Sequence, residues 1–158
     1  YSNDLIGTQI GGALKNIYAI AAGVAEGLNL GENAKSALIS RSFAEMTRYA
    51  KKFKADKNTL FGLSGLGDLI LTCSSKNSRN TQFGIKLASS KYDNFLDLLK
   101  SQEVTEGYYT VKAVYNISQK KNIDMPIMES VYNILYKQHD LKEELSNLLS
   151  RPITEEKI

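Results

Sequence analysis

The sequence is poor in several residue types, and each shortage narrows its possible structure and chemistry. It has one cysteine, Cys73, one histidine, His139, two prolines and no tryptophan. A single cysteine cannot form an internal disulfide, which is typical of a reducing compartment and predicts a cytoplasmic protein. One histidine with no cysteine at ligand spacing predicts that there is no metal site. The two prolines, Pro126 and Pro152, leave long stretches in which a helix can continue without losing a hydrogen bond.

Strong charge and long apolar runs are also lacking. The net charge is only +3, and the short basic clusters at 51–54 and 120–121 are typical of solvated helix faces, so no nucleic-acid partner is predicted. The longest apolar-rich stretch, residues 11–24, is interrupted by Lys15 and Asn16 and is too short to span a bilayer. No basic start precedes an apolar run, so neither membrane insertion nor a signal peptide is predicted.

Apolar residues at helical spacing are abundant. Ile10, Leu14 and Ile17 begin a stripe with steps of four and three. A second stripe with the same spacing consists of Ile39, Phe43, Met46, Ala50 and Phe53. Many glycines and alanines surround the first stripe, which predicts close approach by another backbone or by a ligand. No strand-like alternation of any length is present. We therefore predict one all-α domain of about seven or eight helices over residues 1–158.

Capping residues predict where several of these helices begin. Ser78 is a good N-cap, Pro126 suits a first helical position, and Asp140 with Glu143 resembles a capping box. Asp93 is predicted to cap a further helix containing four apolar residues, Phe95, Leu96, Leu98 and Leu99. The segment 60–67 contains three glycines and is predicted to be a loop.

Lys15 is the first candidate for chemistry, because it lies among glycines, alanines and aliphatic residues. Gly11 precedes it by one helical turn and Ala19 follows it by one. A lysine on such a bare face can project into a cleft, where its ammonium group could donate a proton to a developing alkoxide. The alternative is a lysine that extends from a buried helix to the surface.

Asp68 and Thr72 follow the glycine-rich segment and, being four residues apart, would share one helical face. The glycine order does not fit the dinucleotide-binding fingerprint, which also needs a preceding strand, so we predict no nucleotide site there. Asp68 is a candidate site residue. The alternative is an aspartate that only stabilises a helix start.

Residues 78–80 form a candidate phosphate site. Ser78, Arg79 and Asn80 stand where a helix is predicted to begin, so backbone amides, the positive end of the helix dipole and a guanidinium would lie together. An N-cap serine followed by a surface arginine is also a commonplace helix start.

Taken in order, these segments closely resemble the C-terminal domain of the NAD(P)-dependent glycerol-3-phosphate dehydrogenases of bacterial type. The resemblance extends from about Asp4 to about Leu135. The blocks that carry it are Gly12-Ala-Leu-Lys-Asn16, Ala19-Ile-Ala-Ala-Gly23, Ser40-Arg-Ser-Phe-Ala-Glu-Met46, Gly65-Leu-Gly-Asp-Leu69, Leu71-Thr-Cys-Ser74, Ser78-Arg-Asn80, Phe83-Gly84, Val104-Thr-Glu-Gly107 and Met125-Pro-Ile127.

The resemblance implies a fold, an activity and a set of site residues. The family reduces dihydroxyacetone phosphate to sn-glycerol 3-phosphate for phospholipid synthesis, with NAD or NADP as cofactor. Its helical domain is of the 6-phosphogluconate dehydrogenase C-terminal-like type and faces an N-terminal Rossmann domain across the active site. Carried over by position, Lys15 is the catalytic lysine, and the substrate contacts are Lys15, Asp68, Ser78, Arg79 and Asn80. The cofactor contacts are Arg79, Val104 and Glu106, with Asn16 and Thr72 in support.

The family's amino-terminal glycine-rich fingerprint is absent from these 158 residues, and the chain opens at Tyr1 without an initiator methionine. We therefore expect a fragment that is inactive alone, whose partners are its own Rossmann domain and, as a homodimer, a second copy. Two alternatives stay open at this point. One is the helical domain of another hydroxy-acid dehydrogenase, and the other is a helical interaction module without chemistry.

Overall fold

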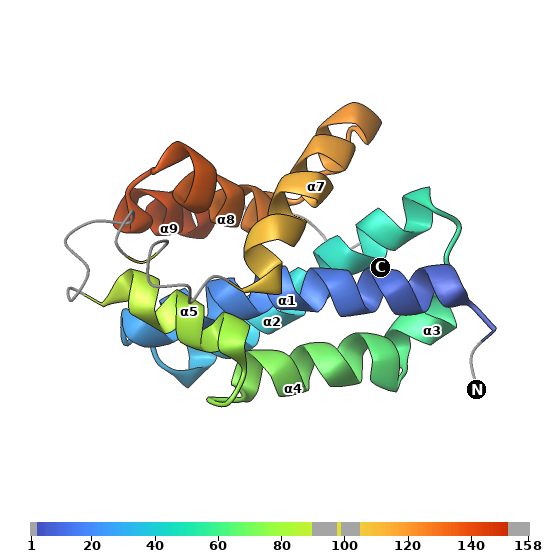
Figure 1. Ribbon diagram of the computed structural model, residues 1–158, viewed down its shortest axis with the longest axis horizontal. Coiled ribbons are helices and arrows are strands. Elements are labelled where there is room, and N and C mark those ends of the chain that lie inside the picture. Colours follow the sequence, from blue (N-terminus) through green and yellow to red (C-terminus); the bar gives the residue numbers. More distant parts are fainter. Residues whose placement is uncertain (1–2, 90–97, 99–104, 152–158) are drawn as a thin grey trace.

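The computed structural model describes residues 3–89, 98 and 105–151, and within them it contains helices and no strand. The predicted all-α fold is confirmed, and the described residues form eight α-helices and one π-helix, where seven or eight helices were predicted (Figure 1). The elements are α1 (Leu5–Gly27), α2 (Glu32–Lys52), α3 (Lys57–Phe61), the π-helix η1 (Leu63–Gly67), α4 (Asp68–Ser74), α5 (Arg79–Ala88), α7 (Glu106–Lys121), α8 (Pro126–Lys137) and α9 (Leu141–Ser150). None of the described helices is both long enough and apolar enough to cross a bilayer.

Helix α1 is the central element of the fold. It runs through the middle of the molecule and contacts α2, α4, α5, α7 and α8 (Figure 1). The predicted stripe is buried on it, with Leu14, Ile17 and Ile20 almost completely shielded from solvent. Because burial is unbroken over residues 17–25, α1 packs on nearly all sides in its C-terminal half. Side chains on α1 can therefore be positioned by several neighbouring helices.

Helices α1 and α5 cross at two facing glycines. A Cβ added at Gly23 would lie 2.0 Å from the carbonyl oxygen of Thr81, and one added at Gly84 would lie 2.1 Å from that of Ile20. Neither distance is compatible with a side chain. The predicted close approach of a second backbone to the small residues of α1 is confirmed, and it brings the start of α5 next to the middle of α1.

Three of the predicted helix starts are confirmed. The hydroxyl of Ser78 accepts a hydrogen bond from the Thr81 amide at 3.3 Å, and Pro126 is the first residue of α8. The carboxylate of Asp140 accepts from the amide of Glu143 at 3.0 Å. These caps satisfy amides that have no partner within their own helix. The helix predicted after Asp93 lies outside the described residues, except for Leu98, which is buried.

The predicted loop at 60–67 is wrong, because the segment contains the end of α3 and all of η1. The amide of Gly67 donates to the carbonyl of Gly62 at 3.2 Å, which is the five-residue step of a π-helix. A Cβ at Gly65 would lie 2.1 Å from the carbonyl oxygen of Leu60. The glycines therefore allow a wide helical turn to pack closely on itself, where the sequence pattern had indicated an irregular connection.

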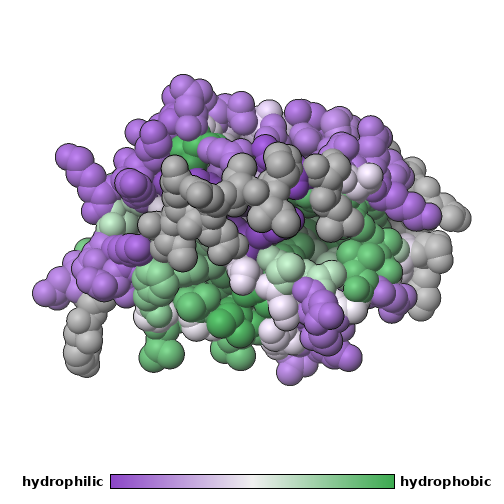
Figure 2. All heavy atoms as spheres, turned by 180° about the vertical axis from the view of Figure 1, so that it is seen from behind, coloured by the Kyte–Doolittle hydropathy of each residue, from purple (hydrophilic) through white to green (hydrophobic). Residues whose placement is uncertain are grey.

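Large hydrophobic side chains are exposed where the start of α1 adjoins α3, η1 and α4. Figure 2 shows hydrophobic residues gathered over the lower part of the face opposite to that of Figure 1. Leu63 on η1 is 90% exposed and Leu71 on α4 is 68% exposed. We call this set the α3–α4 apolar surface, and its members are Leu5, Ile6, Phe61, Leu63, Ile70 and Leu71.

The predicted stripe of α2 is only partly correct. Met46 and Ala50 are buried as predicted, but Ile39 and Phe43 are only half-buried. The buried face instead includes Glu45, which is 1% exposed. The buried face of α2 therefore differs from the predicted apolar stripe and includes the carboxyl group of Glu45. A pattern of apolar residues cannot indicate that a glutamate is buried.

Glu45 is buried because it accepts hydrogen bonds from three groups. Its two oxygens accept from the amides of Ile127 at 2.6 Å and Met128 at 3.2 Å, in the first turn of α8. The hydroxyl of Tyr18 on α1 donates to it at 3.3 Å. Burial nevertheless dominates and raises the pKa of Glu45 from 4.5 to about 7. The Glu45 carboxyl group therefore links α1, α2 and α8. Burial makes its ionised form unfavourable, so ionisation of Glu45 destabilises the folded protein.

We expect the free energy of unfolding to fall as the pH rises from about 4.5 to about 7. Glu45 ionises near pH 4.5 in the unfolded chain but only near pH 7 in the folded protein, so the unfolded state releases its proton first. The loss amounts to at most about 3 kcal/mol for a shift of this size. Urea unfolding of the wild type and Glu45→Gln between pH 5 and pH 8 measures it. An equal pH dependence in both proteins would contradict this role of Glu45.

Candidate active site

Lys15 and Asp68 form an ion pair between α1 and α4. Lys15 lies in the middle of α1, and Asp68 is the first residue of α4, so their side chains meet where the two helices pack. The ammonium group of Lys15 donates a hydrogen bond to Oδ2 of Asp68. The two side chains are 23% and 32% exposed. Lys15 is therefore paired and mostly covered, yet still reachable from solvent, as a group that exchanges a proton with a ligand must be.

Thr72 supports this pair from the next turn of α4. Its hydroxyl donates to the carbonyl of Asp68 at 2.6 Å and lies 3.5 Å from Oδ1 of the same residue. The carbonyl of Thr72 in turn accepts from the hydroxyl of Thr81 at 2.9 Å. Thr81 is fully buried and belongs to α5. It therefore ties the helix that carries Asp68 to the helix that carries Arg79, a role that the sequence did not indicate.

Asn16, next to Lys15 on α1, belongs to a chain of amide hydrogen bonds. The Gly107 amide donates to Oδ1 of Asn80 at 3.0 Å, which fixes the orientation of that side-chain amide. Nδ2 of Asn80 then donates to Oδ1 of Asn16 at 3.1 Å, and Nδ2 of Asn16 donates to Glu106 at 3.3 Å. Each amide must present its nitrogen to the next acceptor, so the orientations are mutually consistent. We call these contacts the amide relay.

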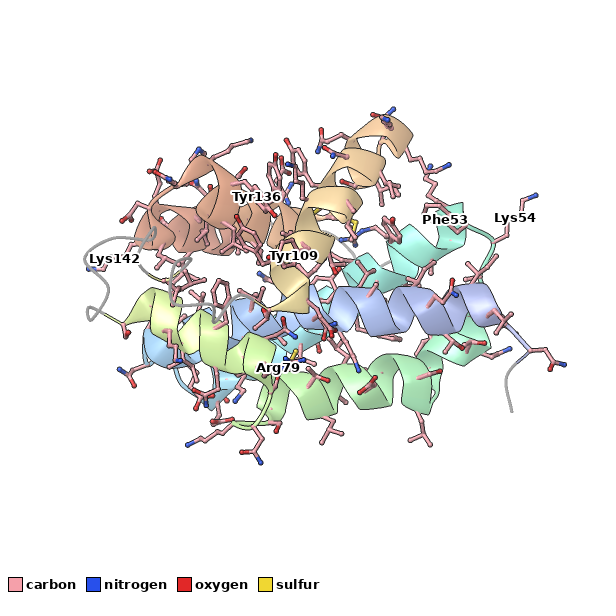
Figure 3. The ribbon with its side chains drawn as sticks, in the orientation of Figure 1. Phe53, Lys54, Arg79, Tyr109, Tyr136 and Lys142 are labelled. Atoms are coloured by element: carbon pink, nitrogen blue, oxygen red, sulfur yellow. The ribbon has the colours of Figure 1, made fainter. Side chains whose placement is uncertain are left out.

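Arg79 lies at the start of α5, where it is 82% exposed (Figure 3). Its Nη2 lies 3.8 Å from Oε1 of Glu106, whose side chain is 72% exposed. Ser78 caps the same helix through its hydroxyl, as described above. Val104 lies outside the described residues. The structure thus places every other predicted site residue in one connected region around the middle of α1.

Gly107 is a residue of this region that was not singled out from the sequence, although it ends the Val104–Gly107 block. A Cβ at Gly107 would lie 2.7 Å from the carbonyl oxygen of Asn16 and 2.7 Å from Oδ1 of Asn80. Only glycine lets the start of α7 approach α1 and α5 this closely. Because Gly107 precedes Tyr108 and follows Glu106, this approach also sets the position of the Glu106 backbone.

We expect Gly107→Ala to destabilise the chain by about 1–3 kcal/mol, since the added methyl group must push the amide relay apart. Gly12→Ala is the matched control, because a Cβ there meets nothing within 4 Å and alanine is the better helix former. Thermal unfolding of both variants measures the difference. Equal stability of Gly107→Ala and the wild type would show that the close approach at α7 is not required.

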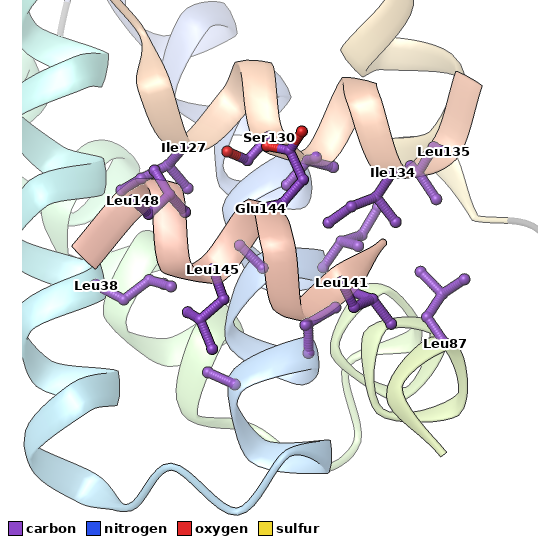
Figure 4. A pocket seen from close by; sticks show the side chains of 15 residues that line it. Leu38, Leu87, Ile127, Ser130, Ile134, Leu135, Leu141, Glu144, Leu145 and Leu148 are labelled. Carbon is purple, nitrogen blue, oxygen red and sulfur yellow. The ribbon is translucent and has the colours of Figure 1, made fainter. Parts of the chain in front are cut away.

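A separate apolar cavity of about 40 Å³ lies between α1, α2, α5, α8 and α9 (Figure 4), and no residue of the amide relay lines it. Leu141, Leu145 and Leu148 of α9 cover it, and Ile134 and Leu135 of α8 form part of its wall. It presents almost no polar groups, so it lacks the donors that a phosphorylated substrate requires. The candidate active site therefore remains the region around Lys15.

Comparison with known proteins points to one family. Residues 4–146 match the family described as NAD-dependent glycerol-3-phosphate dehydrogenase C-terminus. Among curated proteins, the glycerol-3-phosphate dehydrogenase [NAD(P)+] of Colwellia psychrerythraea is 47% identical over 152 residues, which is 96% of this chain and 45% of the relative. That of Staphylococcus carnosus is 45% identical over 153 residues, covering 96% of this chain and 46% of the relative.

Solved structures give the same result. The crystal structure of glycerol-3-phosphate dehydrogenase from Coxiella burnetii aligns with a TM-score of 0.88 and 39% identity over 95% of this chain and 46% of that one. The yeast enzyme GPD1 aligns with a TM-score of 0.81 and 28% identity, covering 94% of this chain and 43% of that one. The chain spans about half the length of the relatives that it matches.

Proposed function

The chain belongs to the NAD-dependent glycerol-3-phosphate dehydrogenase family, whose C-terminal part it matches, and from this we propose that it supplies the catalytic and substrate-binding part of such an enzyme. The proposed reaction interconverts dihydroxyacetone phosphate and sn-glycerol 3-phosphate. The observation that carries this proposal is the pairing of Lys15 with Asp68 close to the start of α5, where Arg79 lies. A proton donor and an anion-binding group are thus presented by helices that are tied together through Thr81.

Lys15 acts as the general acid in the direction of ketone reduction. The nicotinamide cofactor, when bound, supplies the hydride that reaches the carbonyl carbon, and negative charge then develops on the carbonyl oxygen. The ammonium group of Lys15 stabilises this charge and donates its proton to the oxygen. Asp68 holds the ammonium group in place, and the Thr72 hydroxyl restrains Asp68 by donating a hydrogen bond to its carbonyl. In the reverse direction Lys15 accepts the proton from the hydroxyl group.

Arg79 binds the phosphate group of the substrate. Its guanidinium is largely exposed and stands at the amino end of a ten-residue helix, where the helix dipole favours an anion. Asn80 points inward and is 8% exposed, with its side-chain amide engaged by Asn16 and Gly107. We therefore propose that Asn80 mainly holds α1, α5 and α7 together. The substrate contact that the resemblance implies would be an additional role.

The cofactor, NAD or NADP, would be held at its edge by Arg79 and Glu106. Both side chains extend into solvent, as contacts to a group bound mainly by another domain must do. The partner is the N-terminal Rossmann domain that the resemblance implies. Relatives are about twice as long as this chain, and exposed apolar surfaces of several large side chains usually mark a contact with another domain or protein. We assign the α3–α4 apolar surface to that domain, because Leu71 is close to Asp68 on α4. A homodimer and a cytoplasmic location stay predictions.

The test is a fusion of this chain to the N-terminal part of the Colwellia psychrerythraea relative. Oxidation of NADH or NADPH is followed with dihydroxyacetone phosphate and, separately, with a 2-oxo acid such as pyruvate. The proposal requires turnover with dihydroxyacetone phosphate and much less with pyruvate. Preference for the 2-oxo acid would favour a hydroxy-acid dehydrogenase. A correctly folded fusion that binds the cofactor and reduces neither would favour a module without chemistry.

A further inference from the structure

We propose that Glu106 is an internal competitor for Arg79, so that a phosphate group must displace its carboxylate before it can bind. The inference rests on the proposed function, in which Arg79 recognises phosphate. Oε1 of Glu106 lies 3.8 Å from Nη2 of Arg79. At this distance the two groups form an ion pair without a hydrogen bond, and a carboxylate on that side of the guanidinium stands where a phosphate would form its paired hydrogen bonds.

Glu106 differs from an ordinary surface carboxylate, because a hydrogen bond holds its side chain and close packing fixes the neighbouring backbone. Its Oε2 accepts a hydrogen bond from Nδ2 of Asn16 at 3.3 Å. The backbone next to it is fixed by the hydrogen bond from the Gly107 amide to Asn80, in a space that admits no side chain at Gly107. The amide relay therefore presents the carboxylate towards the start of α5.

The size of the effect follows from the exposure of the pair. Most exposed ion pairs contribute little, because two flexible side chains must be ordered in high dielectric. Here the carboxylate is already ordered by Asn16, although Arg79 remains 82% exposed. If the pair is formed in half to four-fifths of the molecules, the apparent affinity for phosphate is lowered about two- to fivefold.

Competition of this kind couples the binding of the phosphate group to the binding of the cofactor. When phosphate takes Arg79, the carboxylate of Glu106 is released and becomes available to the cofactor, with which the resemblance places it in contact. When the cofactor engages Glu106, the carboxylate leaves Arg79, and the five N–H donors of that guanidinium can contact the phosphate group as well as the cofactor. Each ligand then strengthens the binding of the other by the same factor, because coupling between two binding sites is reciprocal.

The first experiment measures inorganic phosphate binding to the 158-residue chain by NMR titration at pH 8 and low ionic strength. We expect Glu106→Gln to bind phosphate about two- to fivefold more tightly than the wild type. Glu143→Gln is the matched control, since it removes the same charge from an exposed position on α9. Arg79→Ala should abolish the binding. A gain in affinity is informative because structural damage would not produce it.

The outcomes separate this inference from the function on which it rests. Phosphate binding that is absent, or that survives Arg79→Ala, overturns the phosphate site and the competition together. Binding that depends on Arg79 but is no tighter in Glu106→Gln than in Glu143→Gln overturns the competition alone. In the fusion protein, sn-glycerol 3-phosphate should tighten NADH binding about two- to fivefold, and Glu106→Gln should remove this coupling. Equal coupling in both proteins also contradicts the proposal.

Discussion

Replacing Lys15 with alanine is expected to lower kcat of the fusion protein by about 100- to 10,000-fold, which is the range that a positioned general acid contributes. The variant loses both the proton donor and the positive charge that faces the developing alkoxide. Folding should be much less affected, because the Lys15 side chain lies at the rim of the core and ends in an ion pair that solvent reaches. Steady-state kinetics with dihydroxyacetone phosphate, alongside thermal unfolding, measure the two effects.

Two further variants make this test specific. Lys15→Arg should also be inactive, because a guanidinium keeps the charge but is a poor proton donor near neutral pH. Lys35→Ala is the matched control, since Lys35 forms an ion pair with Glu26 at 2.8 Å outside the candidate site. It should leave kcat nearly unchanged. A Lys15→Ala protein whose kcat is close to that of the wild type would reduce Lys15 to a structural residue.

Arg79→Ala is expected to lower kcat/KM for dihydroxyacetone phosphate by ten- to more than a hundredfold. Hydrogen bonds to charged groups contribute about 1.5–3 kcal/mol each, and the largely exposed guanidinium has little structural role to lose. Unphosphorylated dihydroxyacetone should be affected far less, because it offers no phosphate to Arg79. Since Arg79 is also an expected cofactor contact, both substrates are compared at saturating cofactor. Equal losses for the two substrates would show that Arg79 does not recognise the phosphate.

The sequence predicted those parts of the fold that depend on local patterns. The stripe of α1 and the caps at Ser78, Pro126 and Asp140 are recognisable because each follows from helical spacing or from a single capping residue. The turn at η1 was missed because it depends on a tight backbone contact of Gly65 that no periodicity reveals.

The residues of the candidate site were proposed mainly from the order of the sequence blocks, and the contacts between these residues were not predictable. Asn16 and Asn80 are 64 residues apart, and Asn16 and Glu106 are 90 apart, so their hydrogen bonds exist only after α1, α5 and α7 have packed. Glu45 was missed for a related reason. A glutamate within a helix is normally exposed, and only the first turn of α8 supplies the amides that allow this one to be buried.

The division of labour between two parts of an enzyme is the central claim, and single-turnover hydride transfer tests it most directly. The 158-residue chain, the separate N-terminal part of the Colwellia psychrerythraea relative and the fusion of the two are each mixed with NADH and dihydroxyacetone phosphate. We expect that, of these three proteins, only the fusion oxidises NADH. A fusion carrying Lys15→Ala should have lost this activity. Rapid NADH oxidation by the 158-residue chain by itself, or by a fusion that lacks Lys15, would contradict the account.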